Sequence, residues 1–536
     1  MSDRVEPPTE SGSIFARRDH ALGLTLLSGA IAALMLFPIT WIFLRALEVD
    51  PGRATDILVR PRSIEIALNS ILLMAGVTVS SVVIGVPLAW LTVRTDLPFR
   101  RFWTVAIALP LAIPSYLGAL AYISAFGPRG ELQSLLAPLG IERLPEIYGL
   151  HGAIFVITLY TYPYVFLTTR AALKTFDTTL VDAARTLDHG YRETFRRITL
   201  PQIWPAITAG ALLVALYAVS DFGTPAFMQL DVFTRQIYVE YRGWNLDYAA
   251  MLSIQLIVVT VVILALESRI RGQERIYSEG GPGAGNGITV ELGRWRWPAL
   301  AACTLVFVAT LVLPVLVFGS WLVGGATSDV QAYQFQWTYA FNSAAVAAAA
   351  AIVAAIAALP IAYFAARYQS RLGDLFERAT YVGYAVPGIV IGLALVFFGA
   401  NYAGIVYQTL PLLIFAYVVR FMPQSVGSTR TAVLQINPKL SEASRTLGRS
   451  SIETFRTVTL PLIAPGIVAG AALVFLTTMK ELPATLLLRP TGFDTLVTHI
   501  WRAEQAAYMS HAAIPAFVIL LVSGLSMVII LRQEDG

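Results

Sequence analysis

Long apolar segments without charged residues constrain this sequence more than any other feature. A helix needs about 20 residues to cross a hydrocarbon layer about 30 Å thick. Eleven segments of sufficient length contain no Asp, Glu, Lys or Arg, namely 21–44, 66–93, 102–128, 147–169, 198–220, 248–266, 297–328, 330–366, 379–419, 457–479 and 505–531. They predict an all-α integral membrane protein.

One of these segments is too long for a single span. Residues 379–419 would form a helix of about 60 Å at 1.5 Å per residue. Gly399, Asn401 and Gly404 stand near its middle, and such residues interrupt helices. We count this segment as two spans, so the sequence predicts about twelve transmembrane helices.

The composition excludes an ordinary soluble protein. Charged residues make up 13% and hydrophobic residues 56% of the 536 residues, whereas soluble domains carry about 25% charged residues. The net charge of +4 comes from short basic clusters between apolar segments, so we expect membrane lipid around the chain and no nucleic acid partner. Cys303 is the single cysteine, which excludes an internal disulfide and a cysteine metal cluster.

Basic residues indicate which ends of the spans face the cytoplasm. With a cytoplasmic N-terminus, 27 Lys and Arg residues fall on the inner side and 11 on the outer side, which sum to the 38 of the sequence. Membrane proteins carry their excess of Lys and Arg on the inner side, so we expect both termini to be cytoplasmic. The polar N-terminus lacks a signal-peptide cleavage site followed by a soluble chain, so we expect the first span to be retained.

The second part of the chain repeats the first. Five positions recur at an offset of 273 and four at an offset of 260, in the pairs Asn69 and Asn342, Ser70 and Ser343, Pro87 and Pro360, Arg94 and Arg367, Pro114 and Pro387, Pro163 and Pro423, Arg170 and Arg430, Asp221 and Glu481, and Tyr248 and Tyr508. Each copy has an even number of spans, so the two copies run in the same direction. We expect 1–270 and 298–536 to be six-span halves and 271–297 to be a cytoplasmic linker.

A cytoplasmic loop is the most similar segment of the two halves. Residues 182–210 and 442–470 share 16 identities in 29 positions. Both begin with an acidic residue, two small residues and an arginine. Small residues let another protein approach closely, and arginine offers a planar set of donors. The loops predict docking sites for two copies of one soluble partner; the alternative is a pair of amphipathic helices on the membrane surface.

These loops resemble the EAA motif of ATP-binding-cassette (ABC) importer permeases, in which Glu-Ala-Ala is followed by Gly and, about a dozen residues later, by Leu-Pro. The second loop fits closely, whereas the first has Asp182 for Glu and Asp188 at the Gly position. The resemblance implies that the docking residues are Asp182, Ala183, Ala184, Arg185 and Gly190 in the first loop and Glu442, Ala443, Ser444, Arg445 and Gly448 in the second.

The resemblance covers nearly the whole chain and implies its assembly. It implies a MetI-like fold of the type I ABC importers, with two parallel six-helix repeats fused in one chain. Each loop would be a coupling helix on one of two copies of an ABC ATPase subunit. An extracytoplasmic substrate-binding protein would deliver the cargo. The location implied is a bacterial inner membrane, which the chain crosses many times.

Catalysis by this chain is not expected. None of the three lysines, Lys174, Lys439 and Lys480, follows a glycine, so a Walker A loop is absent. No histidine pair at metal-ligand spacing and no Gly-x-Ser-x-Gly sequence occurs. We expect no cofactor on this chain and place ATP and Mg on the partner ATPase. A secondary transporter is the alternative, but it needs ionisable groups within its spans.

The substrate is indicated less directly. The fused form and residues 480–496 resemble the permeases of ferric-iron importers, with thiamine and polyamine permeases as alternatives. A trivalent cation prefers oxygen ligands, and Asp221 and Glu481 are equivalent carboxylates at the outer ends of two spans. They are candidates for the substrate path, although the metal site itself remains unassigned. In the alternative interpretation, Asp221 caps a helix and Glu481 pairs with Lys480 or Arg489.

Overall fold

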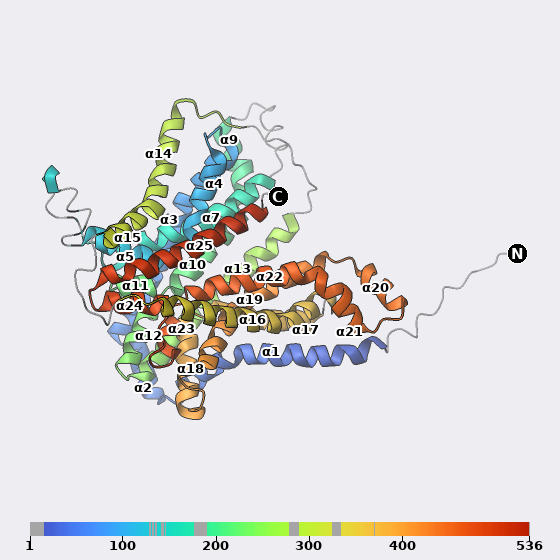
Figure 1. Ribbon diagram of the computed structural model, residues 1–536. Helices are drawn as coiled ribbons and strands as arrows, with labels where there is room; N and C mark the ends of the chain where they lie inside the picture. Colours follow the sequence, from blue (N-terminus) through green and yellow to red (C-terminus); the bar gives the residue numbers. More distant parts are fainter. Residues whose placement is uncertain are drawn as a thin grey trace. The chain divides into compact units, whose positions relative to one another are not determined.

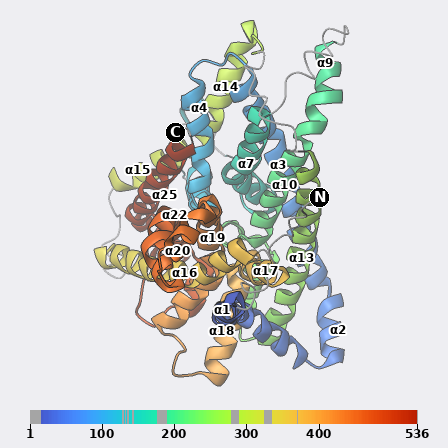
Figure 2. The ribbon, with the colours of Figure 1, turned by 90° about the vertical axis from the view of Figure 1, so that its right-hand side faces the viewer.

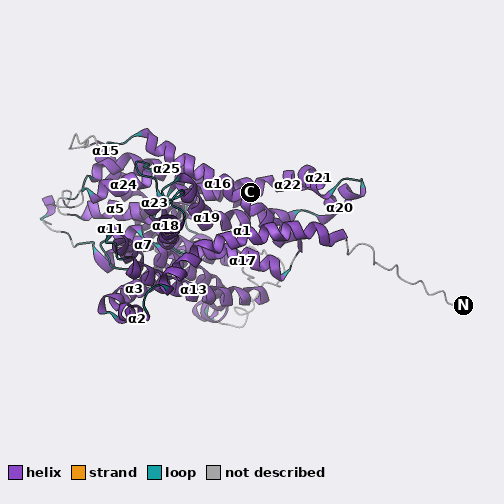
Figure 3. Ribbon diagram, turned by 90° about the horizontal axis from the view of Figure 1, so that it is seen from below, coloured by secondary structure: helices purple, strands orange, loops and turns teal. Residues whose placement is uncertain are grey.

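The computed structural model describes residues 16–127, 130, 133, 137–140, 144, 146–175, 190–277, 289–323, 334–368 and 370–534. Helices dominate this part of the chain (Figure 3), and its single β pairing is an isolated bridge between Thr95 and Val290. The all-α prediction is therefore confirmed for the described residues.

Nine helical segments of the described chain are long and apolar enough to cross a membrane. They are α1 (Ala16–Leu47), α3 (Pro61–Arg94), α7 (Gly149–Thr175), α10 (Leu200–Ser220) with the turn before it, α13 (Leu246–Tyr277), α14 (Arg296–Phe307) continued by α15 (Leu313–Val323), α16 (Trp337–Tyr368), α19 (Leu410–Gln435) and α22 (Leu460–Met479).

Two further helix pairs are broken at a proline and raise the number of candidate spans to eleven. In the first pair, α4 (Arg100–Ala108) and a 3-10 turn meet α5 (Ser115–Phe126) at an angle of 94°. The break falls at Ile113 and Pro114, because a residue before proline is driven out of the helical region and Ile113 has a ψ of 128°. The described chain also has a shorter apolar helical stretch, Met509–Gly524, most of which belongs to α25 (Ala513–Glu534).

Pro387 interrupts the second pair at the equivalent position. It lies between α17 (Arg371–Ala385) and α18 (Gly388–Tyr402). The expected break within 379–419 is present too, because the chain leaves the helix after Tyr402 and α19 begins at Leu410. This segment therefore contains two interruptions, and the sequence interpretation identified only the later one.

The helices group into two compact units. The larger unit contains residues 42–345, 385–413 and 479–536. In it, α3 packs on α7, and α10 packs on both (Figure 2). Glycines permit these close crossings: a Cβ at Gly210 on α10 would lie 2.8 Å from Val165 Cα on α7.

The smaller unit contains residues 1–41, 346–384 and 414–478. It holds α19, α22 and most of α16, together with the short helices α20 (Pro438–Thr446) and α21 (Ser451–Thr454). Gly470 on α22 repeats the close crossing of Gly210, since a Cβ there would lie 2.8 Å from Ser425 Cα on α19.

The first span of each half packs against helices of the other half. Within the smaller unit, α1 lies beside α16 and α17 (Figure 1), and a Cβ at Gly29 would lie 3.2 Å from the Phe376 ring. Within the larger unit, Phe307 on α14 meets the Phe102 ring of α4 at 5.9 Å between centroids. Tyr122 on α5 donates a 2.9 Å hydrogen bond to Ala309 O. The sequence interpretation did not anticipate this exchange.

The repeated Asn-Ser pairs make the same contacts twice in the larger unit. Asn69 Nδ2 donates to Asp231 O at 3.1 Å, and Asn342 Nδ2 donates to Asp494 O at 2.8 Å. Ser70 Oγ accepts from Phe233 N at 3.0 Å, and Ser343 Oγ accepts from Leu496 N at 2.8 Å. Each pair attaches the first part of a long helix to the N-terminal end of a short helix. The sequence repeat is therefore also a structural repeat.

The end of the expected linker is attached to the larger unit. Helix α13 extends to Tyr277, and 278–288 lie outside the described residues. Asp96 then accepts a 2.8 Å hydrogen bond from Leu292 N and pairs with Arg296 at 2.7 Å. These hydrogen bonds hold the pKa of Asp96 below its usual value. The attachment begins immediately before α14.

Candidate docking loops and outer path residues

The second repeated loop forms a short helix with defined ends. Asn437 accepts from Lys439 N at 3.1 Å and caps the start of α20, as short polar side chains do at helix N-termini. The helix ends at Thr446, and Gly448, two residues later, has a φ of +87° in the left-handed region. Glycine adopts this conformation without the steric cost that a Cβ imposes. The glycine of the motif is therefore explained by the shape of the turn.

A side chain of the motif attaches α20 to the rest of the loop. Ser444 is buried and lies 3.1 Å from Thr454 Oγ1. Glu442, Ala443 and Arg445 are exposed. The serine therefore holds the helix in place, and its three neighbours remain available for contact.

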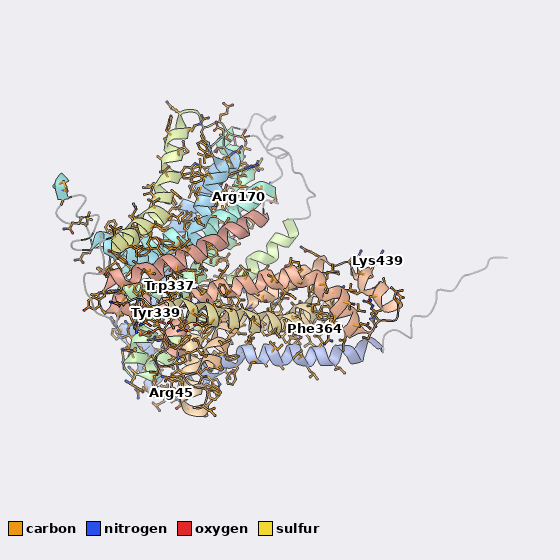
Figure 4. The ribbon with its side chains drawn as sticks, viewed as in Figure 1. Arg45, Arg170, Trp337, Tyr339, Phe364 and Lys439 are labelled. Atoms are coloured by element: carbon orange, nitrogen blue, oxygen red, sulfur yellow. The ribbon has the colours of Figure 1, made fainter. Side chains whose placement is uncertain are left out.

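An exposed apolar surface with charged neighbours surrounds these residues. Leu440, Leu447 and Ile452 are 49%, 85% and 71% exposed. We call these three residues, with Glu442, Ala443 and Arg445, the α20 surface. The loop lies at one end of the smaller unit, where Figure 4 labels Lys439. Exposed apolar residues with polar neighbours are typical of protein interaction sites.

A cavity separates part of this loop from the spans. It has a volume of about 1250 Å³ and is lined by residues of α1, α16, α20 and α21, including Tyr363, Arg367, Glu442 and Arg445. The loop is thus held at Ser444 and by its connections to α19 and α22, with open space beside it.

Most of the first loop cannot be described in the same way. Asp182, Ala183, Ala184, Arg185 and Asp188 lie outside the described residues. Gly190 is exposed, and its carbonyl accepts from Glu193 N and Thr194 N, both at 3.0 Å. Both loops then continue alike: a π-helical turn covers Phe195–Thr199 before α10 and Phe455–Thr459 before α22.

The two outer carboxylates lie at equivalent helix ends. Asp221 follows the last residue of α10, accepts from Ser115 Oγ at 2.8 Å and is stabilised by the backbone of Gly223 at the start of α11 (Gly223–Phe227). Glu481 follows α22 by two residues, is 6% exposed and accepts from Ala484 N at 3.4 Å. Each therefore caps the short helix after it, which for Glu481 is α23 (Pro483–Leu488).

The cations near Glu481 have other partners in the structure. Lys480 Nζ donates to Ala112 O at 3.1 Å, and Arg489 pairs with Asp494. Tyr116 is close enough to both Asp221 and Glu481 to interact with them electrostatically. Among the described residues, no group of three or more His, Cys, Asp or Glu side chains is arranged to hold a metal ion.

An aromatic cluster that the sequence interpretation missed lies beside Asp221. Trp501, on α24 (Leu496–Gln505), stacks on Phe227 at 5.4 Å between ring centroids and lies 5.3 Å from Phe222. Tyr238, on α12 (Phe233–Arg242), meets the same indole at 5.6 Å. These four rings join the short helices of the two halves, and their contacts depend on a tertiary arrangement that sequence spacing does not reveal.

The sequence matches a known protein family in both halves. Residues 81–271 and 358–533 match the family described as "Binding-protein-dependent transport system inner membrane component". The Fe(3+)-transport system permease protein FbpB 2 of Haemophilus influenzae is 31% identical over 511 residues, which are 94% of this chain and 96% of that protein.

Two other relatives differ in length and in the cargo that they are named for. The ferric transport system permease protein FbpB of Actinobacillus pleuropneumoniae is 24% identical and covers 88% of this chain and 72% of its own length. A probable molybdenum ABC transporter permease protein of Haloferax volcanii is 29% identical and covers 50% of this chain with 96% of its own length. A relative that matches half of this chain is expected from the internal repeat.

Proposed function

The chain belongs to the family of binding-protein-dependent transport system inner membrane components, and we propose that it carries ferric iron into the cell as part of an ATP-driven importer. It is a multi-pass membrane protein and the permease component of an ABC importer. The ferric-iron cargo is inferred from the named function of relatives that cover most of the chain.

The α20 surface is the observation that supports an external energy source. Its exposed leucine and isoleucine side chains have charged neighbours and lie outside the apolar spans. We assign it to contact with one ABC ATPase subunit and assign the equivalent first loop to a second copy. ATP and Mg belong to those subunits in this proposal. In this proposal the loops and both termini are cytoplasmic, which the excess of basic residues on the same side supports.

The opposite ends of the spans receive the cargo in this proposal. An extracytoplasmic binding protein delivers it near Asp221 and Glu481, and ATP binding then shifts the population between outward-open and inward-open states. The two carboxylates carry oxygen ligands suited to a hard cation, although both also cap helices. Molybdate is a second candidate cargo, because a relative named for molybdenum transport covers half of the chain.

Purification of the chain with its associated proteins tests the class of transporter. We expect mass spectrometry to find an ABC ATPase and an extracytoplasmic binding protein in the complex. Retention of transport by the chain alone, without an ATPase, would support a secondary transporter and overturn the proposal.

Uptake by the purified complex in lipid vesicles tests the cargo. We expect ATP-dependent accumulation of radioactive iron, and no accumulation with a hydrolysis-deficient ATPase subunit. Uptake of molybdate, thiamine or a polyamine in place of iron would overturn the ferric assignment and leave the importer class intact.

A further inference from the structure

A cavity lined by arginines lies between the short helices of the two halves, within the larger unit. Its volume is about 590 Å³. The walls come from α12 and from the segment that contains α23 and α24, with Tyr238, Val239, Arg242, Leu486, Arg489, Trp501, Arg502, Gln505 and Ala506. Because α10 runs from the first docking loop toward Asp221 and α12 follows it, the cavity lies at the end opposite that loop.

The charges around this cavity do not balance. Its described lining has three guanidinium groups and no carboxylate. Arg489 and Arg502 share one counter-charge, Asp494, which lies 2.7 Å from Arg502 Nη1. No carboxylate of the described chain lies within salt-bridge distance of Arg242. Three positive charges and one negative charge leave a local excess of two positive charges.

The acidic groups at the adjoining cavity do not remove this excess. Glu504 lines a smaller adjoining cavity of about 220 Å³ together with Arg235, and Arg235 pairs with Asp231. Glu504 is outside the lining of the larger cavity, and Asp231 is already shared by Arg235 and Arg62. The excess positive charge of Arg242, Arg489 and Arg502 is therefore confined to the larger cavity.

Partial burial makes the charges of Arg489 and Arg502 costly for the protein alone, because their side chains are 26% and 34% exposed. Burial lowers the pKa of Arg489, and the neighbouring charge of Arg502 lowers it further. Arg502 Nε is also buried without a hydrogen-bond partner in the described chain. Charged donors in such surroundings are stabilised by an anion that supplies negative oxygens.

We propose that this cavity binds a dianionic, oxygen-rich ligand, either a tetrahedral oxyanion or the carboxylates of a ferric chelate. This inference rests on the proposed function and deepens it, because cargo then reaches the permease as an anion and not as bare iron. Guanidinium groups recognise carboxylate and oxyanion oxygens through paired hydrogen bonds. Two excess positive charges repel an uncomplexed trivalent cation.

Trp501 connects this cavity with the residues beneath it. The indole lines the cavity and stacks on Phe227, and it also contacts Phe222, the residue after Asp221. A ligand bound against Trp501 therefore touches the aromatic cluster that joins the short helices of both halves. Through Phe222, this contact links the anion site to the chain segment that contains Asp221, one of the two carboxylates assigned to the outer path.

Direct binding to the full chain in lipid nanodiscs tests the proposal without transport. The probes are sodium sulfate, as a free tetrahedral dianion, and ferric citrate, as a carboxylate chelate, each measured by titration calorimetry. We expect at least one probe to bind, and we expect Arg242→Gln to weaken its affinity at least tenfold. Arg242 is exposed and makes no described ion pair, so this variant is expected to fold. Arg242→Lys retains the charge and should recover part of the affinity.

Arg62→Gln is the matched control. Arg62 lies on α3 and pairs with Asp231, the residue of the first half that corresponds to Asp494. It does not line the cavity. We expect its affinity for the probe to equal that of the unmodified chain. A loss in Arg62→Gln as large as that in Arg242→Gln would mean that general surface charge, and not the cavity, attracts the anion.

The possible results separate this inference from the proposed function. Binding of sulfate alone supports a free oxyanion, and binding of ferric citrate alone supports a chelate. Binding of neither probe overturns the inference, as does binding that Arg242→Gln leaves unchanged. If the cavity binds sulfate but the complex imports no iron in any form, the anion site stands and the ferric-iron proposal fails.

Discussion

The two halves hold their outer short helices with the same frame but different arginines. In the first half, Asp231 pairs with Arg62 from α3 and Arg235 from α12. In the second half, Asp494 pairs with Arg489 and Arg502, and both of these arginines also line the 590 Å³ cavity. The repeat has therefore kept the acidic residue and moved its partners, so that only the second copy places its paired arginines on that cavity.

The comparison also shows how deeply each acidic residue is embedded. The Asp494 side chain is 10% exposed and the Asp231 side chain is 21% exposed. Removal of a more buried carboxylate leaves its arginine partners uncompensated in surroundings that screen charge less, and this costs more free energy. The second copy should therefore depend more strongly on its ion pairs than the first.

The largest expected effect is on stability and comes from Asp494→Asn. Loss of one member of a buried ion pair costs about 3 kcal/mol, whereas Asp231→Asn should cost about 1 kcal/mol because its pairs are more exposed. Unfolding of the purified chain in detergent measures both. Equal losses in the two variants would contradict the difference between the copies.

The shared frame should respond alike in both copies. Ser70→Ala and Ser343→Ala each leave a buried backbone N–H without its hydroxyl acceptor, at a cost of about 1–2 kcal/mol. The same unfolding measurement should give losses that agree within about 0.5 kcal/mol. A clear difference between them would show that the two Asn-Ser contacts are not equivalent.

The two docking loops should differ in how strongly they bind the partner and not in their effect on stability. Glu442→Lys reverses a charge on the α20 surface, and we expect it to weaken association with the ATPase about tenfold. Asp182→Lys should have a smaller effect, because the first loop already departs from the motif. Co-purification of the ATPase with each variant at equal protein levels provides the measurement. Unchanged association in both variants would remove the docking assignment.

The smallest expected effect concerns the equivalent carboxylates Asp221 and Glu481. Their replacement by Asn and Gln removes two negative charges near the outer path. For iron that passes them as a cation, after it has left the anionic form bound at the arginine-lined cavity, we expect uptake to fall about fivefold, corresponding to about 1 kcal/mol of Coulomb attraction. Each single change should reduce uptake less, and basal ATPase activity should stay near that of the unmodified complex. Iron uptake at the unmodified rate in the double variant would leave these carboxylates with helix capping alone.

Local sequence patterns predicted the helices because lipid and proline act locally. Charge-free segments of sufficient length became helices. The repeated prolines Pro114 and Pro387 were visible in the sequence, but the sequence interpretation did not identify the helix breaks at them. Gly448 could be identified from the sequence as part of the loop motif. A left-handed turn after a short helix favours glycine, and this preference is local. The equivalent pairs Asn69 and Asn342, and Ser70 and Ser343, were visible as a repeat, but their hydrogen-bond partners were not.

By itself, the sequence determined that this chain is a helical membrane protein with an internal repeat and two similar loops. Hydrophobicity and turn preferences depend on residues that are close together in the sequence. Only the tertiary structure decided that the first span of each half packs against the other half. It also brought Arg242, Arg489 and Arg502 to one cavity, although Arg242 precedes the other two by more than two hundred positions. Such an excess of charge depends on which distant residues meet and which counter-charges they share, and this is settled by packing.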